Sequence, residues 1–243
     1  MPEIEARTSV PVVLILDDDI EVGTAIAELM RAEGFESTSF ATIGELLASP
    51  LFERANCLIL DVQMPHMSGL EVQERLIAAG FAKPIVFLTG YGDVEQSVRA
   101  MKAGAIDFLT KPAAETVLLG AVKAGVARDI SLREDNRVIR QNMERFAALT
   151  PRETEVLHAV VEGRLNKQIA HQLGIAEITV KLHRSNLMKK MGAASIAELI
   201  RAWESLPIEL RTARSGQLRD RLHSNGACAL MLKHGPSGKV LDE

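Results

Sequence analysis

Residues 57–65 read Cys57-Leu58-Ile59-Leu60-Asp61-Val62-Gln63-Met64-Pro65, an apolar run that ends in a single carboxylate. Four apolar residues bounded by a turn predict a buried strand, most naturally in a parallel sheet. Asp61 then stands at the C-terminal end of that strand, where open α/β sheets place their chemistry. We interpret Asp61 as a nucleophile that accepts a phosphoryl group.

Four further predicted strands, of which the second is a weaker, alternating pattern, are separated by helical patterns in the first half of the chain. They are Val12–Leu16, Phe35–Phe40, Pro84–Gly90 and Ile106–Pro112. Five strands that alternate with helices predict a parallel, doubly wound α/β sheet. We expect the flavodoxin-like strand order 2-1-3-4-5, in which the ends of the first and third strands flank the ligand crevice.

Polar side chains stand at the ends of four of these strands. Asp17 and Asp18 follow the first, Asp61 ends the third, and Thr89 and Lys111 mark the fourth and fifth. Three carboxylates that converge repel one another unless a hard divalent cation lies among them. Mg²⁺ suits such a site because it takes oxygen ligands and also pairs with phosphate oxygens.

Taken singly, these residues have simpler interpretations. An Asp after a strand is usually a helix cap, a Thr can begin a turn and a Lys can be a solvated charge. We keep the cap interpretation for Asp19 alone. The other polar residues fall at strand ends far apart in sequence, which favours one shared site.

At these residues the chain resembles a response-regulator receiver domain, over residues 11–125. The resemblance rests on the Asp-Asp pair, the motif Asp-x-x-Met-Pro-x-Met-Ser-Gly, and the Thr-Gly and Lys-Pro pairs. It implies that Asp61 is the phosphoacceptor. It also implies Mg²⁺ ligation by Asp18, Asp61 and the backbone carbonyl of Gln63, with Asp17 helping through water.

The same resemblance assigns three further residues. Thr89 and Phe108 match the pair that rearranges when the phosphoryl group arrives, and Lys111 matches the phosphoryl-binding lysine. The Lys111–Pro112 peptide bond is expected to be cis. A haloacid-dehalogenase-like phosphatase is an enzymatic alternative, but its Asp-x-Asp-x-Thr/Val signature fails at Glu21. We expect no enzyme, beyond a slow autodephosphorylation.

The composition sets limits on the class of protein. The 243 residues fit two domains better than one, and 47% hydrophobic with 25% charged residues is ordinary for a soluble protein. No apolar run approaches the ~18 residues of a membrane span. Cys57 and Cys228 lack metal-ligand spacing. We therefore expect a cytoplasmic protein without a membrane partner.

Charge is distributed unevenly along the chain. Residues 1–125 contain 9 Lys and Arg against 18 Asp and Glu, a net charge of −9, whereas residues 148–210 contain 8 against 7. This asymmetry indicates two domains with different partners. Residues 126–147 are rich in charged and amide side chains and predict a helical linker, either solvated or paired with a second copy.

The second half begins with a strong helix signal. Thr150 can cap the helix, Pro151 can take its first position, and Glu153 can complete a capping box. A short helix that Asn166 can cap, a glycine turn and a cation-bearing helix over Ile178–Met191 then follow. This order is typical of a helix-turn-helix, whose second helix enters the DNA major groove.

Residues 148–205 resemble the LuxR/FixJ-type output domain. The matching residues include Leu149-Thr150-Pro151-Arg152-Glu153, Asn166-Lys167-x-Ile169-Ala170 and Thr179-Val180-Lys181-x-His183. The resemblance implies base-edge contacts by Lys181, Leu182 and Ser185, and phosphate contacts by Lys167, Thr179, Arg184 and Lys189. We interpret His183 as a packed residue rather than a base reader. Ala176 departs from the Ser-like cap common in the family.

The two resemblances together imply a four-helix, helix-turn-helix output domain behind a receiver domain. The chain is thus identified as a two-component response regulator of the FixJ/LuxR type. Its expected partners are a sensor histidine kinase, promoter DNA, RNA polymerase and, when phosphorylated, a second copy of itself. A regulator controlled by protein contacts without phosphorylation is the alternative. Residues 206–243 carry no motif that assigns a role, and we expect a partly ordered appendage.

Overall fold

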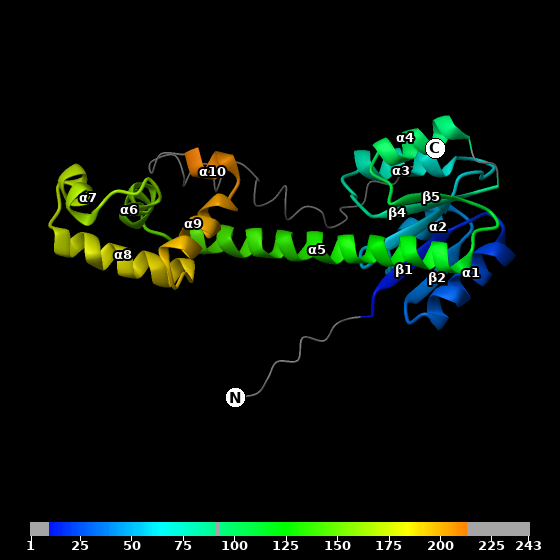
Figure 1. Ribbon diagram of the computed structural model, residues 1–243, viewed down its shortest axis with the longest axis horizontal. Coiled ribbons are helices and arrows are strands. Elements are labelled where there is room, and N and C mark those ends of the chain that lie inside the picture. The colour runs from blue at the N-terminus through cyan, green and yellow to red at the C-terminus, as the bar shows by residue number, and fades with distance from the viewer. Residues whose placement is uncertain (1–9, 91–92, 213–243) are drawn as a thin grey trace. The chain divides into compact units, whose positions relative to one another are not determined.

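The computed structural model describes residues 10–90 and 93–212 of the chain (Figure 1). The chain divides into two compact units, of which the first ends at Arg133 and the second begins at Glu134. Each unit has its own hydrophobic core. Within the described ranges, no helix combines the length and the apolar character that crossing a membrane requires.

The first unit is built on one five-stranded sheet. Its strands are β1 (Val12–Leu16), β2 (Glu36–Phe40), β3 (Cys57–Asp61), β4 (Ile85–Thr89) and β5 (Asp107–Thr110). All neighbouring pairs are parallel, and the order is β2-β1-β3-β4-β5. The expected doubly wound α/β fold, with its flavodoxin-like strand order, is confirmed.

Helices cover both faces of this sheet (Figure 1). They are α1 (Ile20–Ala32), α2 (Ile43–Ala48), α3 (Gly69–Ala78), α4 (Val94–Lys102) and α5 (Glu115–Ala147). Alternate residues of β1 enter different cores: Leu14 packs with residues of α2 and α3, whereas Ile15 packs with residues of α1 and α5. Every residue of β1, β3 and β4 is buried, which explains why these strands read as unbroken apolar runs.

The register of the strands brings their C-terminal ends to one edge. Leu16 pairs with Leu60 across β1 and β3, so Asp17 and Asp61 follow at the same level. Asp61 in turn pairs with Leu88, one residue before Thr89. Parallel pairing therefore gathers side chains that lie far apart in the sequence.

Helix α5 continues past the expected end of the first domain. Asp129 is only 6% exposed, and its carboxylate accepts hydrogen bonds from Asn56 Nδ2, at 2.8 Å, and from Arg133 Nε. Asn56 Oδ1 also accepts a hydrogen bond from the main-chain N of Val12, at 2.8 Å, and Arg133 donates to the carbonyl of Ala55, at 2.7 Å. The segment 126–147 is helical as expected, but it is not solvated throughout.

Replacing Asp129 by Ala tests this anchor. The substitution leaves the Arg133 guanidinium and the Asn56 amide without their shared acceptor, so we expect the first unit to lose about 2–3 kcal/mol of unfolding free energy. Chemical denaturation of the two variants measures the difference. Glu134→Ala is the matched control, because Glu134 and Arg137 form an exposed ion pair on the same helix. An equal loss of unfolding free energy in both variants would contradict the role of Asp129 as an anchor of α5.

In its described part, which ends at residue 212, the second unit contains helices and no strand. Its own helices are α6 (Pro151–Val161), α7 (Asn166–Leu173), α8 (Glu177–Met191), α9 (Ile196–Glu204) and α10 (Ile208–Thr212). The core includes Leu157, Val180 and Leu187, and Phe146 from the end of α5 also enters it. Leu206 and Leu210 are buried in the same core, although they lie past residue 205, where we expected the domain to end. The remainder of the expected appendage, residues 213–243, lies outside the described residues.

The helix starts of this unit differ in their capping. Thr150 caps α6 through a capping box with Glu153, as expected. The prediction for Asn166 is wrong: Leu165 occupies the N-cap position of α7, and Gln168 Oε1 accepts a hydrogen bond from its main-chain N at 2.8 Å. The Asn166 side chain instead accepts a hydrogen bond from Arg184. Ala176 provides α8 with no side-chain cap.

Because α8 lacks a side-chain N-cap, adding one should stabilise the second unit. Ala176 has the extended conformation of an N-cap residue, with φ −70° and ψ 148°, so Ala176→Ser needs no backbone change. We expect this substitution to raise the unfolding free energy of the second unit by about 0.5–1 kcal/mol. Thr150→Ala removes an existing cap and should lower it by about 1 kcal/mol. Thermal unfolding of both variants measures the signs, and a loss of stability in Ala176→Ser contradicts the prediction.

Candidate functional site

Three carboxylates meet at the C-terminal edge of the sheet. Asp17 and Asp18 follow β1, and Asp61 is the last residue of β3. One carboxylate oxygen from each lies within 4.8 Å of the others. Asp17 and Asp61 are 3% and 5% exposed, whereas Asp18 is exposed. Two buried carboxylates this close repel each other strongly, so the site needs positive charge to balance them.

Part of that positive charge comes from Lys111, the residue after β5. Its Nζ donates a hydrogen bond to Asp17 Oδ2 at 2.6 Å and lies 3.3 Å from Asp61 Oδ1. The main-chain N of Lys111 donates to the carbonyl of Thr89 at 2.7 Å, which fixes its position relative to β4. The Lys111–Pro112 peptide bond is cis, as expected.

The pKa directions follow from this arrangement. Burial raises the pKa of the Asp61 carboxyl, and the charge of Asp17 adds to the effect, while Lys111 opposes it. Burial disfavours the charged Lys111 ammonium, but its hydrogen bond to Asp17 and the charges of both carboxylates outweigh that effect and raise its pKa. Lys111 is therefore held protonated beside a carboxylate that is more basic than usual.

The charge of the cluster fits a divalent cation. Three carboxylates and one ammonium leave two negative charges when all are ionised. Magnesium prefers oxygen ligands and usually keeps several of its waters, which the exposed Asp18 side of the cluster permits. The residues present thus match the chemistry of a magnesium site.

The structure also places the two expected switch residues. Thr89 is fully buried at the end of β4, one strand away from Asp61. Phe108 is half-buried on β5, and its ring centre lies 5.9 Å from that of Phe87. Both residues lie on strands that border the acidic cluster or its lysine.

The candidate nucleic-acid surface lies on α8. Lys181, Leu182 and Ser185, the expected base-edge residues, are all exposed and share one face of the helix by their spacing. Two of the expected phosphate contacts, Lys167 at the start of α7 and Lys189 on α8, are also exposed.

The other expected DNA-contact residues are less accessible. Thr179 and Arg184 are half-buried, and Arg184 donates to Asn166 Oδ1 at 3.0 Å. His183 is half-buried as well, which fits the interpretation of a packed residue. Lys190, beside Lys189 in the sequence, instead binds the buried Glu153 at 2.7 Å and holds α8 against α6.

Comparison with known proteins agrees with both halves of this description. The family model for the response regulator receiver domain matches residues 13–123, and the model described as bacterial regulatory proteins, luxR family, matches residues 147–203. The chain belongs to the response regulators with a luxR-family output domain. Its first unit is the receiver domain, and its second unit carries the DNA-binding domain.

Individual relatives cover most of the chain. Nodulation protein W of Bradyrhizobium diazoefficiens is 42% identical over 88% of this chain and 94% of its own. Transcriptional regulatory protein FixJ of Azorhizobium caulinodans is 38% identical over 77% of this chain and 89% of its own. A low-resolution structure of the response regulator StyR is 42% identical and covers 81% of this chain and 99% of its own, with a TM-score of 0.72.

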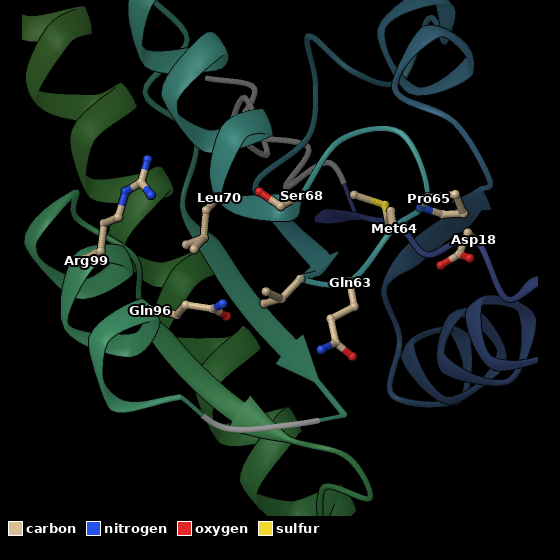
Figure 2. A pocket seen from close by; sticks show the side chains of 9 residues that line it. Asp18, Gln63, Met64, Pro65, Ser68, Leu70, Gln96 and Arg99 are labelled. Atoms are coloured by element: carbon tan, nitrogen blue, oxygen red, sulfur yellow. The ribbon is translucent and has the colours of Figure 1, made fainter.

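A cavity of about 610 Å³ lies beside the acidic cluster of the receiver domain. Figure 2 shows Asp18 and Pro65 at one end and Gln96 and Arg99 of α4 at the other, with Gln63 between them. Asp17, Asp61 and Lys111 do not line it, so the cavity adjoins the cluster rather than containing it. From the sequence we predict only a helix over Val94–Ala103, and nothing in it indicates that Gln96 and Arg99 line this cavity.

The Ser-Gly pair of the receiver motif has a packing role. Ser68 caps α3, and the main-chain N of Gly69 donates to the carbonyl of Val62 at 3.1 Å. A Cβ atom on Gly69 would lie 2.2 Å from the carbonyl oxygen of Asp61 and 3.2 Å from the ring of Phe87. Only glycine lets α3 begin this close to the backbone of the phosphoacceptor candidate.

Substituting Gly69 by Ala should therefore be costly. The clash is with main-chain atoms, which cannot move without displacing β3, so we expect a loss of at least about 2 kcal/mol of receiver stability. Gly44→Ala on α2 is the matched control, because its new methyl group would contact only Thr42, at 3.9 Å. Chemical denaturation compares the two, and a Gly69→Ala protein as stable as Gly44→Ala contradicts the packing argument.

Proposed function

We propose that this response regulator is a DNA-binding transcriptional regulator controlled by phosphorylation of Asp61. The observation that carries the proposal is the buried Asp61 carboxylate, which lies within 4.8 Å of the Asp17 and Asp18 oxygens and 3.3 Å from Lys111 Nζ. A merely structural carboxylate has no need of two acidic neighbours. Three carboxylates beside one ammonium favour the binding of a further cation, and a nucleophile that receives a highly charged phosphoryl group needs that positive charge.

The proposed reaction transfers a phosphoryl group from a phosphohistidine of a sensor kinase. An oxygen of Asp61 bonds to phosphorus as the phosphorus–nitrogen bond breaks, and the imidazole nitrogen keeps the electron pair. Lys111 is placed to neutralise the added charge, and the hydroxyl of Thr89 is assigned to a phosphoryl oxygen.

The metal of this proposal is Mg²⁺. Asp17, Asp18, Asp61 and the backbone carbonyl of Gln63 would hold it, with Asp17 acting through water. When bound, it supplies positive charge that stabilises the phosphoryl oxygens during transfer. The negative charge left on the cluster supports this assignment.

The phosphoryl group is proposed to act as a charge switch. Lys111 is bound to Asp17 in the structure, and a phosphoryl group on Asp61 competes for that ammonium. The region of Thr89 and Phe108 then rearranges, and the surface of α4 and β5, residues 94–108, pairs two receiver domains. Exposed apolar side chains on α4, including Val98 and Met101, support such a contact.

Dimerisation would set the DNA target. Two output domains in one dimer match two half-sites about one helical turn apart. The net charge of +1 over residues 148–210 gives little non-specific attraction to DNA, so pairing and specific contacts must supply the affinity. Promoter DNA, and RNA polymerase recruited to it, are the proposed downstream partners.

Phosphoryl incorporation tests the proposal directly. The full-length protein is incubated with acetyl phosphate, with and without Mg²⁺, and its intact mass and sedimentation are measured. We expect one phosphoryl group and a dimer only when both Asp61 and Mg²⁺ are present. Asp61→Ala should gain no mass. Asp19→Asn is the matched control, because Asp19 caps α1 outside the acidic cluster and Asn also serves as a cap.

Two results contradict the proposal. One is incorporation that persists in Asp61→Ala, which places the acceptor elsewhere. The other is a wild-type protein that accepts no phosphoryl group from acetyl phosphate or from a sensor kinase. The second result favours a regulator controlled by protein contacts alone, with the DNA-binding half unchanged.

A further inference from the structure

The exposed face of α8 carries two large aliphatic side chains. Ile178 is 73% exposed and Leu182 is 59% exposed. The two residues are four positions apart, so their side chains lie one above the other on one face of the helix. The core-facing side of α8 is already complete, because Val180, Leu187 and Met191 are at most 1% exposed. Ile178 and Leu182 therefore contribute little to the packing of their own domain.

The surroundings of this pair are polar and mainly cationic, with one acidic residue, the exposed Glu177 next to Ile178. Lys181 lies between the two residues, and Ser185 and Lys189 continue the same exposed face. Arg184 and Lys167 stand nearby, because Arg184 is bonded to Asn166, the residue before Lys167. An identical surface on a second copy would bring lysines against lysines, which disfavours self-association through this face. A polyanion with small apolar groups on its surface is the complementary partner.

The DNA major groove has this combination of properties. Its edges are lined by phosphates, and the C5-methyl group of thymine is the apolar feature that its base edges present. Aliphatic side chains make contact with this methyl group, while neighbouring lysines meet phosphates or guanine. Cytosine and the purines offer an aliphatic side chain no equivalent methyl group.

We propose that Ile178 and Leu182 are specificity-determining residues that each recognise the methyl group of a thymine in the half-site. This inference rests on the proposed function, because it requires α8 to enter the major groove. Four residues of helix rise about 6 Å, and stacked bases rise about 3.4 Å, so the two thymines lie within roughly two base steps. Lys181 adjoins Leu182, and its Nζ lies 3.7 Å from Oε1 of the exposed Glu177. This ammonium is placed for a phosphate or a guanine.

The experiment separates the methyl group from every other feature of the base. Binding sites are first selected from random duplexes with the full-length protein, both untreated and treated with acetyl phosphate and Mg²⁺. Each thymine of the selected half-site is then replaced by deoxyuridine, which keeps the hydrogen-bonding groups and lacks only the methyl. Affinity is measured for the wild type, Ile178→Ala and Leu182→Ala. Ile208→Ala is the control, because Ile208 is 56% exposed on α10 of the same unit.

We expect deoxyuridine to weaken wild-type binding about threefold to fivefold at each of two thymines, the scale for burial of one methyl-sized group. For Ile178→Ala, deoxyuridine should no longer weaken binding at one of these thymines and should still weaken it at the other. Leu182→Ala should show the reverse pattern. Ile208→Ala should keep both penalties, because its side chain lies outside α8.

Failure of this inference and failure of the proposed function give different results. Selected sites without a deoxyuridine-sensitive thymine overturn the thymine assignment and leave DNA binding intact. The thymine assignment is also overturned if deoxyuridine weakens binding by the same factor in the wild type and in both α8 variants. Another residue then contacts the methyl groups. If no sequence is enriched under either condition, both the inference and the DNA-binding function are overturned.

Discussion

The Lys111 ammonium between two buried carboxylates is the interaction on which the receiver domain depends. It lies 2.6 Å from Asp17 and 3.3 Å from Asp61, and it offsets a repulsion that burial makes severe. The rest of the fold brings these groups together. Parallel strands align their C-terminal ends, and Gly69 allows α3 to begin against the backbone of Asp61. A cluster that remains negative after this neutralisation is prepared for a cation and for one phosphoryl group.

The same arrangement makes the site suitable for control. The Lys111 ammonium is shared by two carboxylates, so a new anion on Asp61 would change its partners. Lys111 directly follows β5, and its main-chain N is bonded to the carbonyl of Thr89 at the end of β4. The proposed phosphorylation is thus a local change of charge, and the proposed dimer contact on α4 and β5 responds to it. We propose that the output domain contributes specificity through α8, whose exposed face combines lysines with two aliphatic residues. The first unit supplies the phosphoacceptor candidate, and the second supplies the candidate DNA-binding surface.

Sequence reasoning identified the elements whose signals are local. Unbroken apolar runs located β1, β3 and β4, and polar strand ends located Asp61 and Lys111, because parallel pairing leaves few alternatives. Three features escaped it, the first two because they depend on tertiary partners. Asp129 lies in a charge-rich segment that does not show which carboxylate is buried. Leu206 and Leu210 lie past the last recognised motif, and only the structure shows that they pack in the core of the second unit. Leu165, rather than Asn166, stands at the N-cap of α7, a difference of one residue.

The central claim is that a phosphoryl group on Asp61 controls DNA binding. The most direct test is the affinity of the full-length protein for its selected DNA site, with Asp61 unmodified and phosphorylated as verified by mass. Coupling between two sites of this kind typically amounts to roughly 5–150-fold in affinity. We predict a gain in that range for the wild type and none for Asp61→Ala treated identically. Equal affinity of the unmodified and fully phosphorylated wild-type protein would contradict the account.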